Sequence, residues 1–153
     1  MGYRSSDEIL KRMFFRKLYN RMSDKGRLAV FISTVAACVV GLVVLTVGCI
    51  MMKNSNDLRV PMLIAAIGFV LAGLGIAAGS FVSDAASHRS RSGIYRNELA
   101  QSCVDPASTD GIAMAKDMNK QKDLDRKMGI ISTIVPVSTV VLAILIIALV
   151  FIL

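Results

Sequence analysis

The stretch VPMLIAAIGFVLAGLGIAAGSFV, Val60–Val82, carries no charged side chain and is rich in glycine and alanine. As a helix rising 1.5 Å per residue it would measure about 35 Å, enough to cross a bilayer core with some tilt. Leu28–Met52 and Ile130–Leu153 are equally free of Lys, Arg, Asp, Glu and His. Because backbone in lipid must satisfy its own hydrogen bonds, and these segments lack the alternation of barrel strands, we predict an all-α integral membrane protein with three transmembrane helices.

The basic residues predict how these helices are oriented. Of the 18 Lys and Arg residues, eight precede the first span, eight lie between the second and third spans, and only two lie in Lys53–Arg59. The positive-inside rule therefore places the N-terminus and the long loop in the cytoplasm and the C-terminus outside, in a bacterial inner membrane or a plasma membrane. The net charge of +7 is explained by topology and by attraction to anionic lipid at the cytoplasmic face, so we expect no nucleic-acid partner.

The predicted organisation has six segments. They are a basic amphipathic cytoplasmic segment (1–27), the first span (28–52), a short outer loop (53–59), the second span (60–82), a cytoplasmic helical hairpin or loop (83–129) and the third span (130–153). The loop KNSNDLR is short and made of turn formers, which predicts a tight hairpin of the first two spans.

The long loop is expected to be largely helical. Ser83–Cys103 can continue the second span, DPASTDG (105–111) is a break rich in turn residues, and Ile112–Met128 resumes helical character. A partly disordered loop is the alternative, especially at the polar stretch Ser87–Ser92.

The N-terminal segment predicts an amphipathic helix that Gly26 can end. Leu10, Phe14 and Leu18 recur every four residues with Phe15 beside them, whereas Arg12 and Arg16 fall on the other side. Such a helix can lie on the inner leaflet with its basic side chains at the headgroups. A solvated tail or a helix packed on a partner protein fits the same pattern.

Small residues form two sets on the second span. The first is Ala65, Gly68, Ala72, Gly75 and Gly79, whose alternating spacing of three and four residues is typical of a continuous packing seam. The second is Ala66, Gly73, Ala77 and Ser80, roughly 130° away. In lipid, helices associate where small residues let their backbones approach, so both sets predict close contacts, within the chain or with another copy.

The other spans offer matching small residues. On the first span these are Ser33, Ala37, Gly41 and Gly48, with Thr34 beside them; on the third they are Ser132, Pro136, Thr139 and Ala143. We therefore interpret the second span as the hub of the membrane domain.

The sequence indicates no enzyme. The spans contain no ionisable residue of the kind that marks ion paths or intramembrane catalysis, and no phosphate loop is present. One histidine and three scattered cysteines give no metal spacing, so we expect no catalytic residue, metal or cofactor. Asp84 and His88 are four residues apart and are interpreted as a structural pair.

Three functions remain. The first is a non-enzymatic subunit or scaffold of a larger, possibly homo-oligomeric membrane complex, and the second is an oligomeric pore or membrane-permeabilising protein. The third is an effector inserted into a host membrane, because Leu28–Val82, two spans joined by a seven-residue turn, resembles the bilobed hydrophobic hairpin of chlamydial inclusion-membrane proteins. That resemblance carries no specific motif and does not include the third span.

Overall fold

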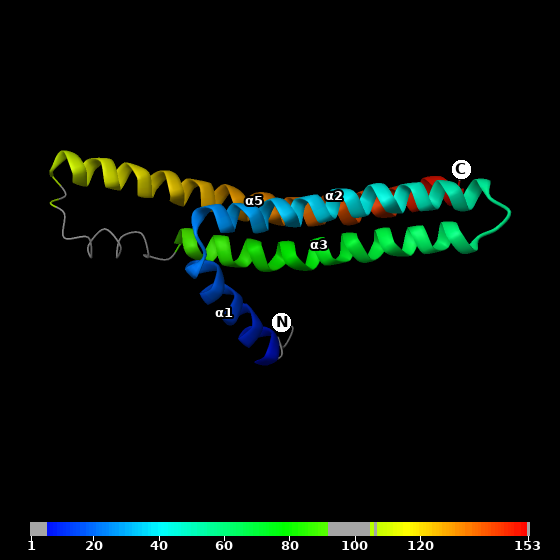
Figure 1. Cartoon of the computed structure of the whole chain (residues 1–153), viewed down its shortest axis with the longest axis horizontal. Coiled ribbons are helices and arrows are strands. Elements are labelled where there is room, and N and C mark those ends of the chain that lie inside the picture. The colour runs from blue at the N-terminus through cyan, green and yellow to red at the C-terminus, as the bar shows by residue number, and fades with distance from the viewer. Residues whose placement is uncertain (1–5, 92–104, 106, 153) are drawn as a thin grey trace. The chain divides into compact units, whose positions relative to one another are not determined.

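The computed structural model describes residues 6–91, 105 and 107–152, and this part of the chain is all-α. Its helices are α1 (Ser6–Arg21), α2 (Asp24–Asn54), α3 (Arg59–Arg91) and α5 (Thr109–Ile152) (Figure 1). By length and composition α2, α3 and α5 could each span a membrane, in agreement with the three predicted spans. The chain divides into unit 1 (Met1–Met22 and Val82–Ile131) and unit 2 (Ser23–Phe81 and Ser132–Leu153).

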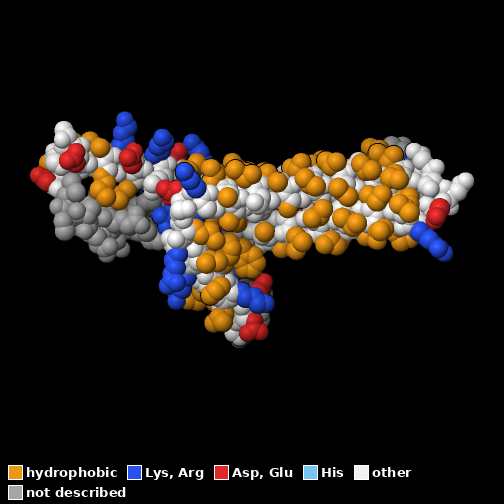
Figure 2. Space-filling view, viewed as in Figure 1, with side chains coloured by type: hydrophobic (Ala, Val, Ile, Leu, Met, Phe, Trp, Pro, Cys, Tyr) orange, Lys and Arg blue, Asp and Glu red, His pale blue; other side chains and the backbone are white. Residues whose placement is uncertain are grey.

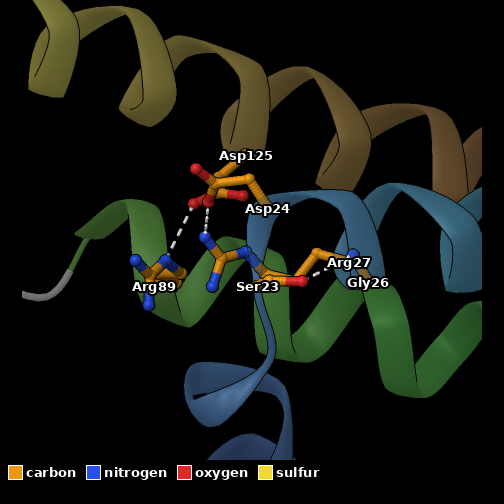
Figure 3. Close-up of polar contacts among 6 residues, drawn as sticks. All are labelled: Ser23, Asp24, Gly26, Arg27, Arg89 and Asp125. Carbon is orange, nitrogen blue, oxygen red and sulfur yellow. Dashed lines mark hydrogen bonds and ion pairs between the residues drawn. The ribbon is translucent and has the colours of Figure 1, made fainter.

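The start of α2 corrects one expectation from the sequence. Gly26 does not end the first helix, because it lies inside the first turn of α2. Ser23 caps this turn instead, its hydroxyl accepting a hydrogen bond from the backbone N–H of Gly26 at 3.2 Å (Figure 3). Arg27 pairs with Asp24 in the same turn (Figure 3). A serine that can satisfy an orphan amide therefore sets this boundary.

Two helices run well beyond the predicted spans. α3 continues from the second span to Arg91, and the remainder of the predicted helix to Cys103 lies outside the described residues. α5 joins the predicted helix 112–128 and the third span into one helix of 44 residues. The Ser108 hydroxyl caps its start by accepting from the Gly111 N–H at 3.0 Å, which places the helix beginning within the predicted break.

The apolar helices of unit 2 are covered with hydrophobic side chains on the visible face (Figure 2). Large residues such as Val43, Leu63 and Ile144 are more than half exposed. Because exposing so many large apolar side chains to water is unfavourable, this surface suits a lipid environment.

Within unit 2, α2 and α3 approach so closely that their glycines leave no room for a side chain. A Cβ built on Gly48 would lie 2.5 Å from the backbone N of Ala65, and one on Gly75 would lie 2.8 Å from the backbone N of Cys38. Gly41 meets Ala72 and Gly68 meets Leu45 in the same way. Backbone therefore touches backbone along the hairpin, which accounts for the close packing of α2 on α3.

α5 completes the packing of unit 2 at Gly79. A Cβ on Gly79 would lie 2.8 Å from Cγ of Pro136 and 3.3 Å from the carbonyl oxygen of Ser132, with Cγ2 of Thr34 at 3.4 Å. Pro136 has no N–H to donate to the Ser132 carbonyl one turn earlier, so this carbonyl lacks its usual helical partner. Further along, Ala143 and Val150 pack on a buried cluster of Leu45, Cys49 and Ala65.

Replacing Gly75 with leucine is expected to destabilise unit 2, because the new side chain would collide with the α2 backbone beside Cys38. We expect the free energy of unfolding to fall by at least about 1–3 kcal/mol, since backbone atoms, unlike a side chain, cannot rotate out of the way. Thermal unfolding in mild detergent measures the effect. In the purified chain without a partner, Gly73→Leu is the matched control, because nothing lies within 4 Å of a Cβ at Gly73; Leu74→Ala should also be mild. Equal loss in all three variants would contradict the packing argument.

Candidate functional site

The charged contacts of unit 1 lie where α1, α3 and α5 bring side chains together from distant parts of the sequence. Arg16 on α1 donates two hydrogen bonds to Asp84 on α3, from Nε to Oδ2 at 2.8 Å and from Nη2 to Oδ1 at 2.9 Å. Both groups are partly buried. This two-point geometry fixes the orientation of both planar groups and is stronger than a single contact.

Asp84 is held in its charged form by its surroundings. The hydrogen bonds from Arg16 lower the pKa of Asp84 below its ordinary value, burial acts in the opposite direction, and the charges of Arg16, Arg12 and His88 lower it further. The pKa of Arg16 is raised in return, chiefly by the hydrogen bond to Asp84. The pair therefore stays ionised throughout the neutral range.

The two sides of α1 have opposite character. Tyr19 is fully buried and its ring lies beside that of Phe15, with centroids 6.2 Å apart. Leu10 and Phe14 are 71% and 70% exposed, and Leu18 is exposed as well. Arg12, Phe15 and Arg16 are only partly exposed. The packed side of α1 thus carries the arginines and the rings of Phe15 and Tyr19, and the side with Leu10, Phe14 and Leu18 is open.

A buried ion pair joins α3 to α5 in unit 1 (Figure 3). Nε of Arg89 lies 3.1 Å from Oδ2 of Asp125, and these side chains are 5% and 4% exposed. Nearby, the Ser83 hydroxyl donates to the carbonyl oxygen of Gly129 at 3.0 Å. A Cβ on Gly129 would lie 2.9 Å from Oγ of Ser87, so the absence of a side chain there allows the two helices to approach.

A polar hollow of about 680 Å³ lies between α3 and α5 in unit 1. In the described part of the chain, α3 and α5 line it with Ser87, Ser90, Arg91, Asn119, Lys122, Asp123, Arg126 and Ile130. A smaller hollow of about 320 Å³ is lined by Arg16, Asp84, Ser87, His88 and Arg91. Arg91 and Ser87 therefore border both spaces.

The packing residues proposed from the sequence occupy different environments in unit 2. The first small set of α3 is buried throughout, and so are Gly41 and Gly48 of α2 and Ser132, Pro136 and Thr139 of α5; Ala143 is partly buried. Ser33 is exposed, and its hydroxyl donates a hydrogen bond to the Ala29 carbonyl oxygen. Ala37 is partly buried, and its carbonyl carbon would lie 3.2 Å from a Cβ built on Gly75. Their role in assembly stays a prediction.

Sequence reasoning missed Cys38 and Leu45, which are buried on the packed face of α2. Thr34, Cys38, Gly41, Leu45 and Gly48 alternate at spacings of four and three, a pattern that could have placed them on one face. Only small residues were considered on this span, and the pattern was missed because Leu45 is large.

The second small set of α3 is exposed in the described part of the chain. Ala66, Gly73, Ala77 and Ser80 are all exposed, and nothing lies within 4 Å of a Cβ built on Gly73. α2 and α5 both pack against the first set. The contact that the sequence predicts for the second set is therefore not made within the described residues.

No family model, curated protein or solved structure matches this chain. Function must therefore be argued from its own residues.

Lowering the pH is expected to release α1 from α3. The pairing with Arg16 lowers the pKa of Asp84, so the ion pair contributes fully to stability above the ordinary pKa of aspartate, about 4. This contribution is lost as the pH falls through the lowered pKa of Asp84 in the folded chain. Spin labels can be attached to cysteines that replace Lys17 and Lys120 in a chain without its native cysteines. The distribution of distances between the two labels should broaden at low pH. In Asp84→Asn the distance distribution should be broad at every pH. Asp123→Asn removes an exposed ion pair and should give the wild-type distribution. A narrow distribution in Asp84→Asn would contradict the assignment.

Removing one member of the buried pair is expected to separate α3 from α5 in unit 1. Asp125→Ala leaves the Arg89 charge without its carboxylate, which costs about 3–5 kcal/mol at a buried site. Chemical unfolding in detergent measures the loss. Arg89→Met with Asp125→Leu should recover most of the stability, because a buried charge pair can be replaced by apolar groups. A double variant no more stable than Asp125→Ala would contradict this account.

Proposed function

We propose that this chain is a non-enzymatic integral-membrane subunit or scaffold, held in a larger complex through the second small set of α3. The observation that carries the proposal is the exposure of Ala66, Gly73, Ala77 and Ser80 while the first small set is already packed. Small side chains on a lipid-exposed helix allow a partner helix to approach closely, and hydrophobic burial offers little drive for association in lipid.

The proposed topology follows the distribution of basic residues. The N-terminus and residues 83–129 face the cytoplasm, and Lys53–Arg59 and the C-terminus face the other side. On the cytoplasmic side the open apolar residues of α1, Leu10, Phe14 and Leu18, offer a surface for the inner leaflet or for a partner protein.

An oligomeric pore is the second candidate. The same exposed set would then form the contacts between copies of this chain, and the protein would make membranes leak. The two candidates differ in the identity of the helix that covers Gly73 and Ala77.

Photo-crosslinking in native membranes tests the proposal. A photoactivatable diazirine reagent attached to Ala77→Cys, in a chain whose Cys38, Cys49 and Cys103 are replaced by alanine, should give a specific crosslinked species, because the carbene formed on irradiation inserts into C–H or N–H bonds of a partner that approaches this face. Leu74→Cys is the matched control, since Leu74 is also exposed but does not belong to the second small set.

The size of the crosslinked species separates the candidates. A heterologous product supports the subunit, whereas a dimer of this chain together with dye leakage from vesicles supports the pore. Equal crosslinking at both positions, or none at either, would contradict the proposed contact surface.

A further inference from the structure

The larger polar hollow of unit 1 has the composition of an anion site. Arg91 of α3 and Lys122 and Arg126 of α5 all line it. Among the described residues of its lining, Asp123 is the only carboxylate, and it forms an ion pair with Lys127 one turn later at 2.9 Å. The other acidic residue of this turn, Asp125, is engaged by Arg89. Among the described lining residues, three cationic side chains therefore outweigh a single, already paired, negative charge.

The polar groups of the lining favour a ligand that also carries hydroxyls. The Ser90 hydroxyl donates its hydrogen to the Ser87 carbonyl oxygen at 3.0 Å, so its oxygen can still accept but not donate. Asn119 and Asp123 add further acceptor oxygens. Acceptors of this kind suit the hydroxyl groups of a polyol, and the arginines and lysine suit the phosphate.

The position of the hollow along the chain selects a lipid as the source. Its lining runs on α5 from Asn119 to Ile130, the first residue of the third apolar segment, and on α3 it lies within nine residues of the second. A headgroup in the hollow could therefore leave its acyl chains beside apolar helix. Basic pockets between helices next to the bilayer are the usual form of a lipid-headgroup site.

We propose that this hollow binds an anionic phospholipid whose phosphodiester headgroup carries free hydroxyls. Arg91, Lys122 and Arg126 hold the phosphate, and Ser90, Asn119 and Asp123 accept hydrogen bonds from the headgroup hydroxyls. The site needs only that the chain spans a membrane; it does not depend on the proposed assembly through α3, and either can fail without the other.

Native mass spectrometry of the full chain in detergent tests the site, with phosphatidylglycerol as the probe and phosphatidylcholine as the zwitterionic comparison. The wild-type chain should retain phosphatidylglycerol preferentially. Lys122→Gln and Arg126→Gln should each weaken retention roughly five-fold, the usual effect of one basic residue near an anionic lipid. Both side chains are exposed, so these variants should keep their helical circular dichroism.

Lys120→Gln is the matched control, because Lys120 is exposed on the same helix but does not line the hollow. Equal weakening by Lys120→Gln, or equal retention of phosphatidylcholine, would overturn the site in favour of general surface attraction. Glycerophosphoglycerol, the soluble headgroup, separates the two sources of the phosphodiester. If millimolar glycerophosphoglycerol does not displace phosphatidylglycerol, the result supports a lipid as the ligand. If glycerophosphoglycerol displaces the lipid at an equal concentration, the result overturns the lipid assignment.

Discussion

The packing of unit 2 depends on the direct contact of the α2 and α3 backbones. Four glycines, Gly41, Gly48, Gly68 and Gly75, lie where any side chain would meet main-chain atoms of the opposite helix. In lipid, dispersion contacts between closely approaching helices replace much of the drive that hydrophobic burial supplies in water. The same face of α3 then reaches Pro136 of α5 through Gly79, so one stripe of small residues organises all three apolar helices.

Unit 1 is held together by a different kind of contact. Its helices are tied by charged pairs, Arg16 with Asp84 and Arg89 with Asp125, and by the hydrogen bond from Ser83 to Gly129. All three contacts involve the extension of α3 beyond its apolar segment, where the chain changes from small apolar residues to a stretch with Ser, Asp, His and Arg. One helix thus carries two packing chemistries in succession, apolar contact and then ion pairing.

Much of this architecture could be predicted. Long uncharged segments identify three candidate spans because few other structures tolerate them, and the alternating spacing of Ala65 to Gly79 identifies the buried stripe of α3. The pairing of Arg16 with Asp84 could not be predicted, since the two residues are 68 positions apart and Asp84 had a nearer candidate partner in His88. The start of α2 was missed because a glycine was preferred to Ser23 as the boundary, although a serine before a helix is a strong capping signal.

The sequence by itself determined which segments are apolar, where the charges gather and which helix faces are small, because these properties follow from residue type and helical periodicity alone. Only the tertiary structure decided which small face is occupied. α2 and α5 both pack on the first set of α3, and the second set, with Gly73 at its centre, stays exposed. The physical reason is that small side chains permit close approach on either face, so the choice between the two sets rests on the shape of the neighbouring helices, above all the matching of Gly41 and Gly48 to Ala72 and Ala65.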